Sequence, residues 1–146
     1  MDDDDLLRYS RQIMLPELGI ALVVGLGGLG SPAAMYLTAA GIGTLALADD
    51  DRVDLSNLQR QVLHTTQRIG LAKTVSAGQG LRALNPAPRL VLHHTRLRDA
   101  ALRAAVAEAD VVLDCSDNSA TRFALNRLCH ALHKPLVSGA AIRWDG

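Results

Sequence analysis

The stretch ALVVGLGGLGSPAAMYLTAAG, residues 21–41, decides the fold. It runs from apolar residues through a glycine cluster into an alanine-rich segment, and the glycines are Gly25, Gly27, Gly28 and Gly30. The apolar run predicts a short buried strand. Ser31 and Pro32 predict the N-cap and first position of a helix, and Gly41 predicts its end. Because each glycine costs backbone entropy, such a cluster indicates that something must approach the backbone more closely than a Cβ allows.

The rest of the chain continues the alternation of strand and helix. We expect strands at residues 21–24, 44–48, 89–93, 111–114 and 136–138, and helices at residues 31–40, 71–84, 99–108 and 119–132. Short, continuously apolar strands separated by helices are typical of a parallel sheet covered on both faces. We therefore predict a doubly wound, mostly parallel α/β domain of the Rossmann-like, nucleotide-binding kind at residues 21–146, preceded by an N-terminal helical arm at residues 1–20.

The composition excludes several classes of protein. Lys plus Arg and Asp plus Glu number 15 each, so the basic excess that attracts nucleic acid or anionic membranes is absent. No apolar run approaches the ~18 residues of a membrane span, and the N-terminus is acidic where a secretory signal is basic. We predict a cytoplasmic protein with no nucleic-acid or membrane partner. Cys115 and Cys129 are expected to be core residues, and His93 and His94 to lie at an edge or on the surface.

Polar clusters follow three of the predicted strands. Residues 25–30 match G-x-G-x-x-G and lead into a helix N-terminus, which favours phosphate. Residues 49–51, three aspartates, stand about 20 residues further on, where an acid holds a ribose hydroxyl. Residues 115–118, CSDN, follow the fourth strand. Because ligands bind beyond the carboxyl ends of the strands, the sequence predicts a glycine cradle and two acidic clusters on one rim.

The long polar segment at residues 51–73, DRVDLSNLQRQVLHTTQRIGLAK, bears on the choice of ligand. The glycine motif alone suggests a nicotinamide- or flavin-dependent oxidoreductase, which has little use for this segment. If the segment folds over the rim, Arg60 and Lys73 match a triphosphate better than a single pyrophosphate. An NAD-dependent oxidoreductase and a non-catalytic nucleotide-binding or dimerisation module remain as alternatives.

Five segments carry a more specific pattern than the glycine loop. They are RYSRQIMLPELGI, VVGLGGLGSPAAMYLTAAGIGTLALADDD, LSNLQRQVLH, GLAK and DVVLDCSDNSATRFALN. Together they resemble the ubiquitin-activating-enzyme-like adenylyltransferases of bacterial cofactor synthesis, the MoeB/ThiF type. The C-terminal KPLVSGAAIRWDG is more similar to the MoeB branch than to the ThiF branch.

The resemblance implies an activity and a partner. Such enzymes use MgATP to adenylate the C-terminal glycine carboxylate of a ubiquitin-like sulfur-carrier protein, MoaD- or ThiS-like, for molybdenum cofactor or thiamin biosynthesis. Because that carboxylate is already ionised at neutral pH, the reaction needs no nucleophilic side chain or general base. Cys115 is therefore not expected to be catalytic.

The resemblance also implies the site residues. Those expected to bind the nucleotide are Gly27, Gly28, Asp49, Ser56, Asn57, Arg60, Lys73, Asp117 and Asn118. The expected catalytic residues are Arg60, Lys73, Asp117 and Arg11. Asp49 is expected to hold the ribose and Asp117 to hold Mg²⁺. Arg11 is expected to reach the triphosphate of the neighbouring subunit, which makes a homodimer part of the site.

The sequence departs from the family pattern in two places. Relatives carry roughly ten further residues between the segment like PELGI and the first strand, a connection that turns the chain into the sheet, whereas Ile20 directly precedes Ala21 here. Relatives also continue past the position of Gly146 into a C-terminal half with structural zinc on Cys-x-x-Cys pairs. We expect that half, and its zinc, to be absent from this chain.

Overall fold

The computed structural model describes Asp4, Arg8 and residues 19–141. Within residues 19–141 the strands are β1 (Ile20–Val24), β2 (Thr44–Ala48), β3 (Arg89–His93), β4 (Val111–Asp114) and β5 (Leu136–Ser138). The helices there are α2 (Gly30–Ala39), α3 (Lys73–Leu84), α4 (Asp99–Glu108) and α5 (Ser119–Ala131), with short 3-10 helices η1 (Leu55–Asn57) and η2 (Thr66–Arg68). The sheet order is β3-β2-β1-β4-β5 and every neighbouring pair is parallel. The predicted doubly wound parallel sheet is confirmed.

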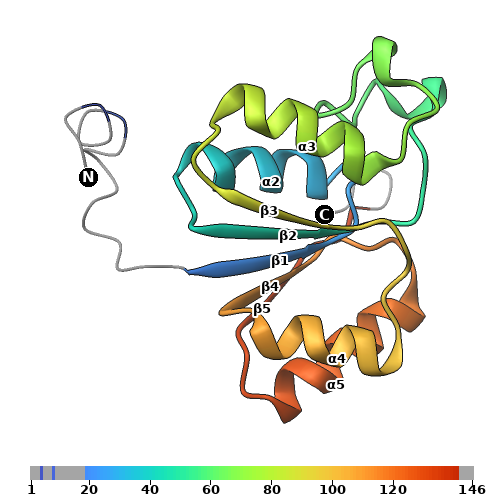
Figure 1. Ribbon diagram of the computed structural model, residues 1–146. Coiled ribbons are helices and arrows are strands. Elements are labelled where there is room, and N and C mark those ends of the chain that lie inside the picture. The colour runs from blue at the N-terminus through green and yellow to red at the C-terminus, as the bar shows by residue number, and fades with distance from the viewer. Residues whose placement is uncertain (1–3, 5–7, 9–18, 142–146) are drawn as a thin grey trace.

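Helices cover both faces of the sheet, α2 and α3 on one and α4 and α5 on the other (Figure 1). Alternate residues of β1 point to opposite faces of the sheet. Ala21 and Val23 pack against α2 and α3, whereas Leu22 and Val24 pack against α4 and α5. Both faces of the strand are buried, which is why its sequence is a continuous apolar run. Burial of each valine or leucine side chain in this strand stabilises the fold by about 1.5–3 kcal/mol.

The start of α2 differs from the prediction. The helix begins at Gly30 with Leu29 at the N-cap, so Ser31 lies in the first turn and the predicted capping role is wrong. The Ser31 hydroxyl instead donates to the Leu26 carbonyl (3.2 Å). Because Leu26 belongs to the glycine loop, this bond ties the loop to the helix.

The predicted end of α2 at Gly41 is confirmed. Gly41 has a φ of +80°, a left-handed conformation that glycine adopts without strain. Its N–H donates to the Thr38 carbonyl (3.1 Å) and that of Ile42 donates to the Leu37 carbonyl (3.2 Å). These bonds satisfy carbonyls that the helix leaves open.

Backbone hydrogen bonds join the two ends of the segment at residues 53–72, which precedes α3. The helix starts two residues later than predicted. Val53 N–H donates to the Leu71 carbonyl (2.8 Å) and Lys73 N–H to the Asp51 carbonyl (2.9 Å). A Cβ on Gly80 of α3 would lie 3.0 Å from Leu63 Cδ1. The glycine therefore makes room for residues 53–72 to pack on the helix.

The remaining predictions concern the termini and the surface. The predicted arm, residues 1–20, lies largely outside the described residues, and its last residue, Ile20, belongs to β1. Cys129 is buried and Cys115 partly buried, both as free thiols, while His93 lies on the edge strand β3 and His94 is exposed. In the part of the chain that the structure describes, no helix has the length and apolar composition needed to cross a bilayer.

Candidate functional site

A cleft of about 710 Å³ lies at the carboxyl ends of β1, β2 and β4. The strand register brings these ends level, because Val24 pairs with Ala48 on one side and with Asp114 on the other. The predicted nucleotide-binding residues that line the cleft are Gly27, Gly28, Asp49, Arg60, Lys73, Asp117 and Asn118. The segment at residues 53–72 folds against the same end of the sheet (Figure 1), so residues far apart in sequence share one rim.

Two predicted residues lie outside the lining of the cleft, and a third is not among the described residues. Ser56 does not line the cleft, and its N–H donates to the carboxylate of Asp54 (2.8 Å) at the start of η1. Asn57 is also outside the lining, but its Oδ1 accepts from Arg60 Nη2 (3.3 Å) and so steadies that guanidinium. Arg11 lies outside the described residues.

The four glycines of the loop have two different roles. A Cβ on Gly25 would lie 2.5 Å from the Cys115 carbonyl oxygen, and one on Gly30 would lie 1.7 Å from that of Gly25. On Gly27 and Gly28 the nearest atoms would be at 3.5 and 3.6 Å, on the side chains of Gln61 and Arg60, which are ordinary contacts. The fold therefore requires Gly25 and Gly30, whereas at Gly27 and Gly28 the open backbone faces the cleft.

Asp49 joins the glycine loop to the end of β2. Its Oδ2 accepts from Leu26 N–H (2.7 Å) and its Oδ1 from Asp51 N–H (2.8 Å). A carboxylate has about four lone-pair positions, so Asp49 can hold the loop and still accept a hydroxyl from the cleft.

Lys73 places a buried positive charge on the wall of the cleft. The residue is 4% exposed, and among the described residues the one hydrogen-bond partner of its ammonium is Asp51 Oδ2 at 3.2 Å. An ammonium has three donors, so two remain for an anion in the cleft. Because the Asp51 side chain is 66% exposed, water weakens its hold on the ammonium.

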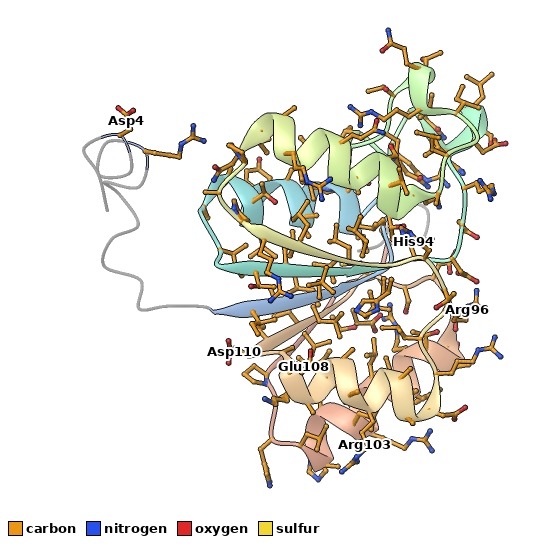
Figure 2. The ribbon with its side chains drawn as sticks, viewed as in Figure 1. Asp4, His94, Arg96, Arg103, Glu108 and Asp110 are labelled. Carbon is orange, nitrogen blue, oxygen red and sulfur yellow. The ribbon has the colours of Figure 1, made fainter. Side chains whose placement is uncertain are left out.

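Two acidic groups are candidates for a metal site. The carboxylates of residues 49–51 lie within 4.8 Å of one another, the one such group in residues 19–141. Asp50 in that group pairs with Arg96 (3.4 Å), which Figure 2 shows on the connection from β3 to α4. Asp117, the predicted Mg²⁺ ligand, is exposed on the loop after β4. The Oδ1 of Asn118 beside it accepts from Thr121 N–H (2.9 Å) and caps α5, which leaves its amide group for the cleft.

Sequence reasoning missed the buried polar residues beneath the cleft. Asp114 is fully buried and accepts from the hydroxyls of Ser116 (2.6 Å) and Ser138 (3.1 Å), with Arg122 Nε at 3.5 Å. Gln61 is buried and lines the cleft, with an Oε1 that has no partner among the described residues. The available signal for Asp114 was an acid ending an otherwise apolar strand.

His64 is a further missed residue. Its ring is buried between the glycine loop and α3, with Nε2 3.0 Å from the Leu26 carbonyl oxygen and Nδ1 2.8 Å from Ser76 Oγ. Burial lowers the pKa of His64, so the imidazole is neutral at physiological pH.

Cys115 lines the cleft as a neutral thiol. Burial, and then the negative charge of Asp114, raise its pKa to about 11. Since only the thiolate is nucleophilic, we expect iodoacetamide at pH 8 to modify Cys115 about 100-fold more slowly in the native protein than in urea. Mass spectrometry of a Cys129→Ala variant measures both rates on a single thiol. Equal rates in the two states would contradict the neutral-thiol assignment.

The sequence of the chain is similar to those of several known proteins. The sequence model of the ThiF family matches residues 9–146. The chain is 50% identical to the sulfur carrier protein ThiS adenylyltransferase of Escherichia coli (strain K12), covering 100% of this chain and 62% of that protein. It is 48% identical to the adenylyltransferase and sulfurtransferase MOCS3 of Drosophila willistoni, covering 100% of this chain and 34% of that protein.

A solved structure shares the architecture. The E. coli tRNA N6-threonylcarbamoyladenosine dehydratase TcdA, in complex with ATP, has a TM-score of 0.86 and 28% identity over 97% of this chain and 64% of that one. The chain thus spans less than two thirds of each relative named here. Alignments with the first two cover 156 positions against 146 residues, so they hold 156 − 146 = 10 positions that this chain lacks. That number agrees with the roughly ten further residues expected in relatives, and their place before Ala21 stays a prediction.

Proposed function

The chain belongs to the ThiF family, and on that premise we propose that it adenylates the C-terminal carboxylate of a ubiquitin-like sulfur-carrier protein with ATP. The observation that carries the proposal is the buried ammonium of Lys73 in a cleft that Gly27, Gly28 and Arg60 also line. Backbone N–H groups at a helix N-terminus bind phosphate. Two fixed cations nearby suit a triphosphate better than the single pyrophosphate of NAD.

The chemistry requires charge neutralisation more than proton transfer. A carboxylate oxygen of the carrier attacks the α-phosphorus of ATP, the bond from that phosphorus to the bridging oxygen breaks, and pyrophosphate leaves. Because an anion attacks an anion, most of the barrier comes from repulsion and alignment. Lys73 and Arg60 are suited to offset this charge, and Asp49 to orient the nucleotide through its ribose.

We propose Asp117 as the residue that holds Mg²⁺. Its carboxylate is an oxygen ligand of the kind that Mg²⁺ prefers, and it is exposed on the cleft wall at the loop after β4. When bound to ATP phosphates, the ion shields their negative charge. Among the described residues, Asp117 forms no ion pair that would compete for this role.

Partner and pathway rest on the relatives. Identities of 50% to a ThiS adenylyltransferase and 48% to a MOCS3 support a MoaD- or ThiS-like carrier and cofactor synthesis of the molybdenum or thiamin type. A homodimer completed by Arg11 and a cytoplasmic location are proposed from the family resemblance. Structural zinc belongs, in this proposal, to the part of the longer relatives that this chain does not match.

Ligand-dependent melting tests the nucleotide class. A ligand at 100 times its Kd stabilises a protein by about 2.7 kcal/mol, which for this size is roughly 5–10 °C in Tm. We expect MgATP to produce such a shift and NAD to produce none. Asp117→Ala should respond equally to ATP with and without Mg²⁺. A shift with NAD and none with MgATP would replace the proposal by the oxidoreductase alternative.

A non-catalytic nucleotide-binding module is the second candidate, because the chain spans 62% of one relative and 34% of the other. Exchange of labelled pyrophosphate into ATP separates the two candidates, since only an enzyme that forms the acyl-adenylate reversibly incorporates the label. Running the assay with a MoaD-like and a ThiS-like carrier in turn identifies the substrate. ATP binding without carrier-dependent exchange would favour the module.

A further inference from the structure

Side chains of other residues form hydrogen bonds with both backbone polar groups of Leu26 in the glycine loop. Its N–H donates to Asp49 Oδ2 (2.7 Å). Its carbonyl accepts from Ser31 Oγ (3.2 Å) and lies 3.0 Å from His64 Nε2. A loop whose N–H groups must meet a phosphate is thus held in shape by three side chains before any ligand arrives.

The partners of His64 determine which ring nitrogen carries the proton. A carbonyl oxygen only accepts, so Nε2 donates to Leu26. Nδ1 is then the acceptor, and the Ser76 hydroxyl donates to it (2.8 Å). The neutral ring satisfies both contacts. The charged groups that act on it are Lys73 and Arg68, which disfavour a second proton, and Asp49, which favours one.

The position of His64 in the chain connects the two walls of the cleft. The backbone N–H of His64 donates to the carbonyl of Gln61 (3.0 Å). Gln61 follows Arg60 and ends the LSNLQRQ motif. Ser76 lies in the first turn of α3, which begins with Lys73. His64 therefore belongs to the segment that carries Arg60, and its buried ring touches both the glycine loop and the helix that carries Lys73.

We propose that His64 is a positioning residue that sets the separation between the glycine loop and the cations of the opposite wall, so that a triphosphate meets both at once. This role rests on the proposed ATP site. His64 is absent from the lining of the cleft, so it acts through its hydrogen bond to Leu26 and does not touch the nucleotide.

Two amide substitutions separate the two contacts of the ring. In His64→Gln the terminal amide reaches the position of Nε2 and can still donate to Leu26. In His64→Asn it reaches only the position of Nδ1, so the contact with Ser76 is kept and that with Leu26 is lost. Because Ser31 still donates to the Leu26 carbonyl, no buried acceptor is orphaned and the Asn variant is expected to fold. Ser76→Ala is the matched control for the other contact.

The measurement is calorimetric binding of MgATP and of adenosine to the full chain, with Tm recorded for each variant. We expect His64→Asn to weaken MgATP about tenfold, the effect of one lost hydrogen bond, with adenosine binding unchanged. His64→Gln and Ser76→Ala should stay within about threefold of wild type for both ligands.

The possible results separate this inference from the proposed function. Loss of ATP and adenosine affinity in equal proportion, or identical behaviour of the Asn and Gln variants, would show a structural role only and overturn the inference. Wild-type protein that bound MgATP normally, with His64→Asn unaltered, would overturn the inference and leave the proposed function standing. Wild-type protein that bound neither ligand would overturn both.

Discussion

Lys73→Met is expected to reduce carrier-dependent pyrophosphate exchange by several hundredfold while the protein remains folded. Methionine keeps most of the apolar stem and removes only the ammonium. Loss of one preorganised donor to a transition state typically raises the barrier by about 3–4 kcal/mol, or 10²–10³ in rate. The partner left behind, Asp51, is largely exposed, so water solvates its carboxylate and the free energy of unfolding changes little.

The chain supplies its own control for this prediction. Lys134 is the second of its two lysines and lies partly buried between α5 and β5, away from the cleft. Lys134→Met makes the same chemical change and is expected to leave exchange within about twofold of wild type, as surface changes away from special features do. If the exchange rate of Lys73→Met stayed within tenfold of wild type, the proposed role of the Lys73 ammonium in the reaction would be wrong.

The fold was predictable because its signals are local. The central strands hold uninterrupted apolar runs, as at residues 45–48, and a residue such as Gly41 marks a helix end. The error at Ser31 arose because the glycine loop winds directly into α2, so a residue with N-cap chemistry falls two residues inside the helix. Local signals thus indicated the elements well and their first residues less well.

The site was predictable only in part, for a different physical reason. Charged residues in a motif, such as Arg60 and Lys73, were assigned by type and spacing, and the structure brings both to one cleft. Ser56 was assigned from the family resemblance, yet its N–H donates to the carboxylate of Asp54, which caps η1. His64 carries no local signal, and Asp114 carries only that of an acid ending an apolar strand, because their roles depend on which buried groups the tertiary fold places against them. Sequence spacing indicates the chemistry that is available, and packing decides which groups are free to use it.

We expect Gly30→Ala to lose stability and Gly28→Ala to lose nucleotide binding. At Gly30 the new methyl would lie 1.7 Å from the Gly25 carbonyl oxygen. The obstacle is backbone, so no rotamer change relieves it, and the first turn of α2 must separate from the loop. We expect the free energy of unfolding to fall by more than about 4 kcal/mol, a large share of the 5–15 kcal/mol typical of a domain. Urea denaturation followed by circular dichroism measures this loss.

At Gly28 the nearest atom to the new methyl would be Arg60 Cδ at 3.6 Å, an ordinary contact with a flexible stem. The free energy of unfolding should therefore change by less than about 1 kcal/mol. The methyl would, however, occupy backbone surface that a phosphate must approach, so MgATP should no longer raise the Tm. The reverse outcome, a stable Gly30→Ala and an unfolded Gly28→Ala, would contradict the division of the loop into structural and ligand-facing glycines. Because the two substitutions add the same methyl within three residues of each other, a difference between them reports what each glycine leaves room for: the protein's own backbone at Gly30 and the nucleotide at Gly28.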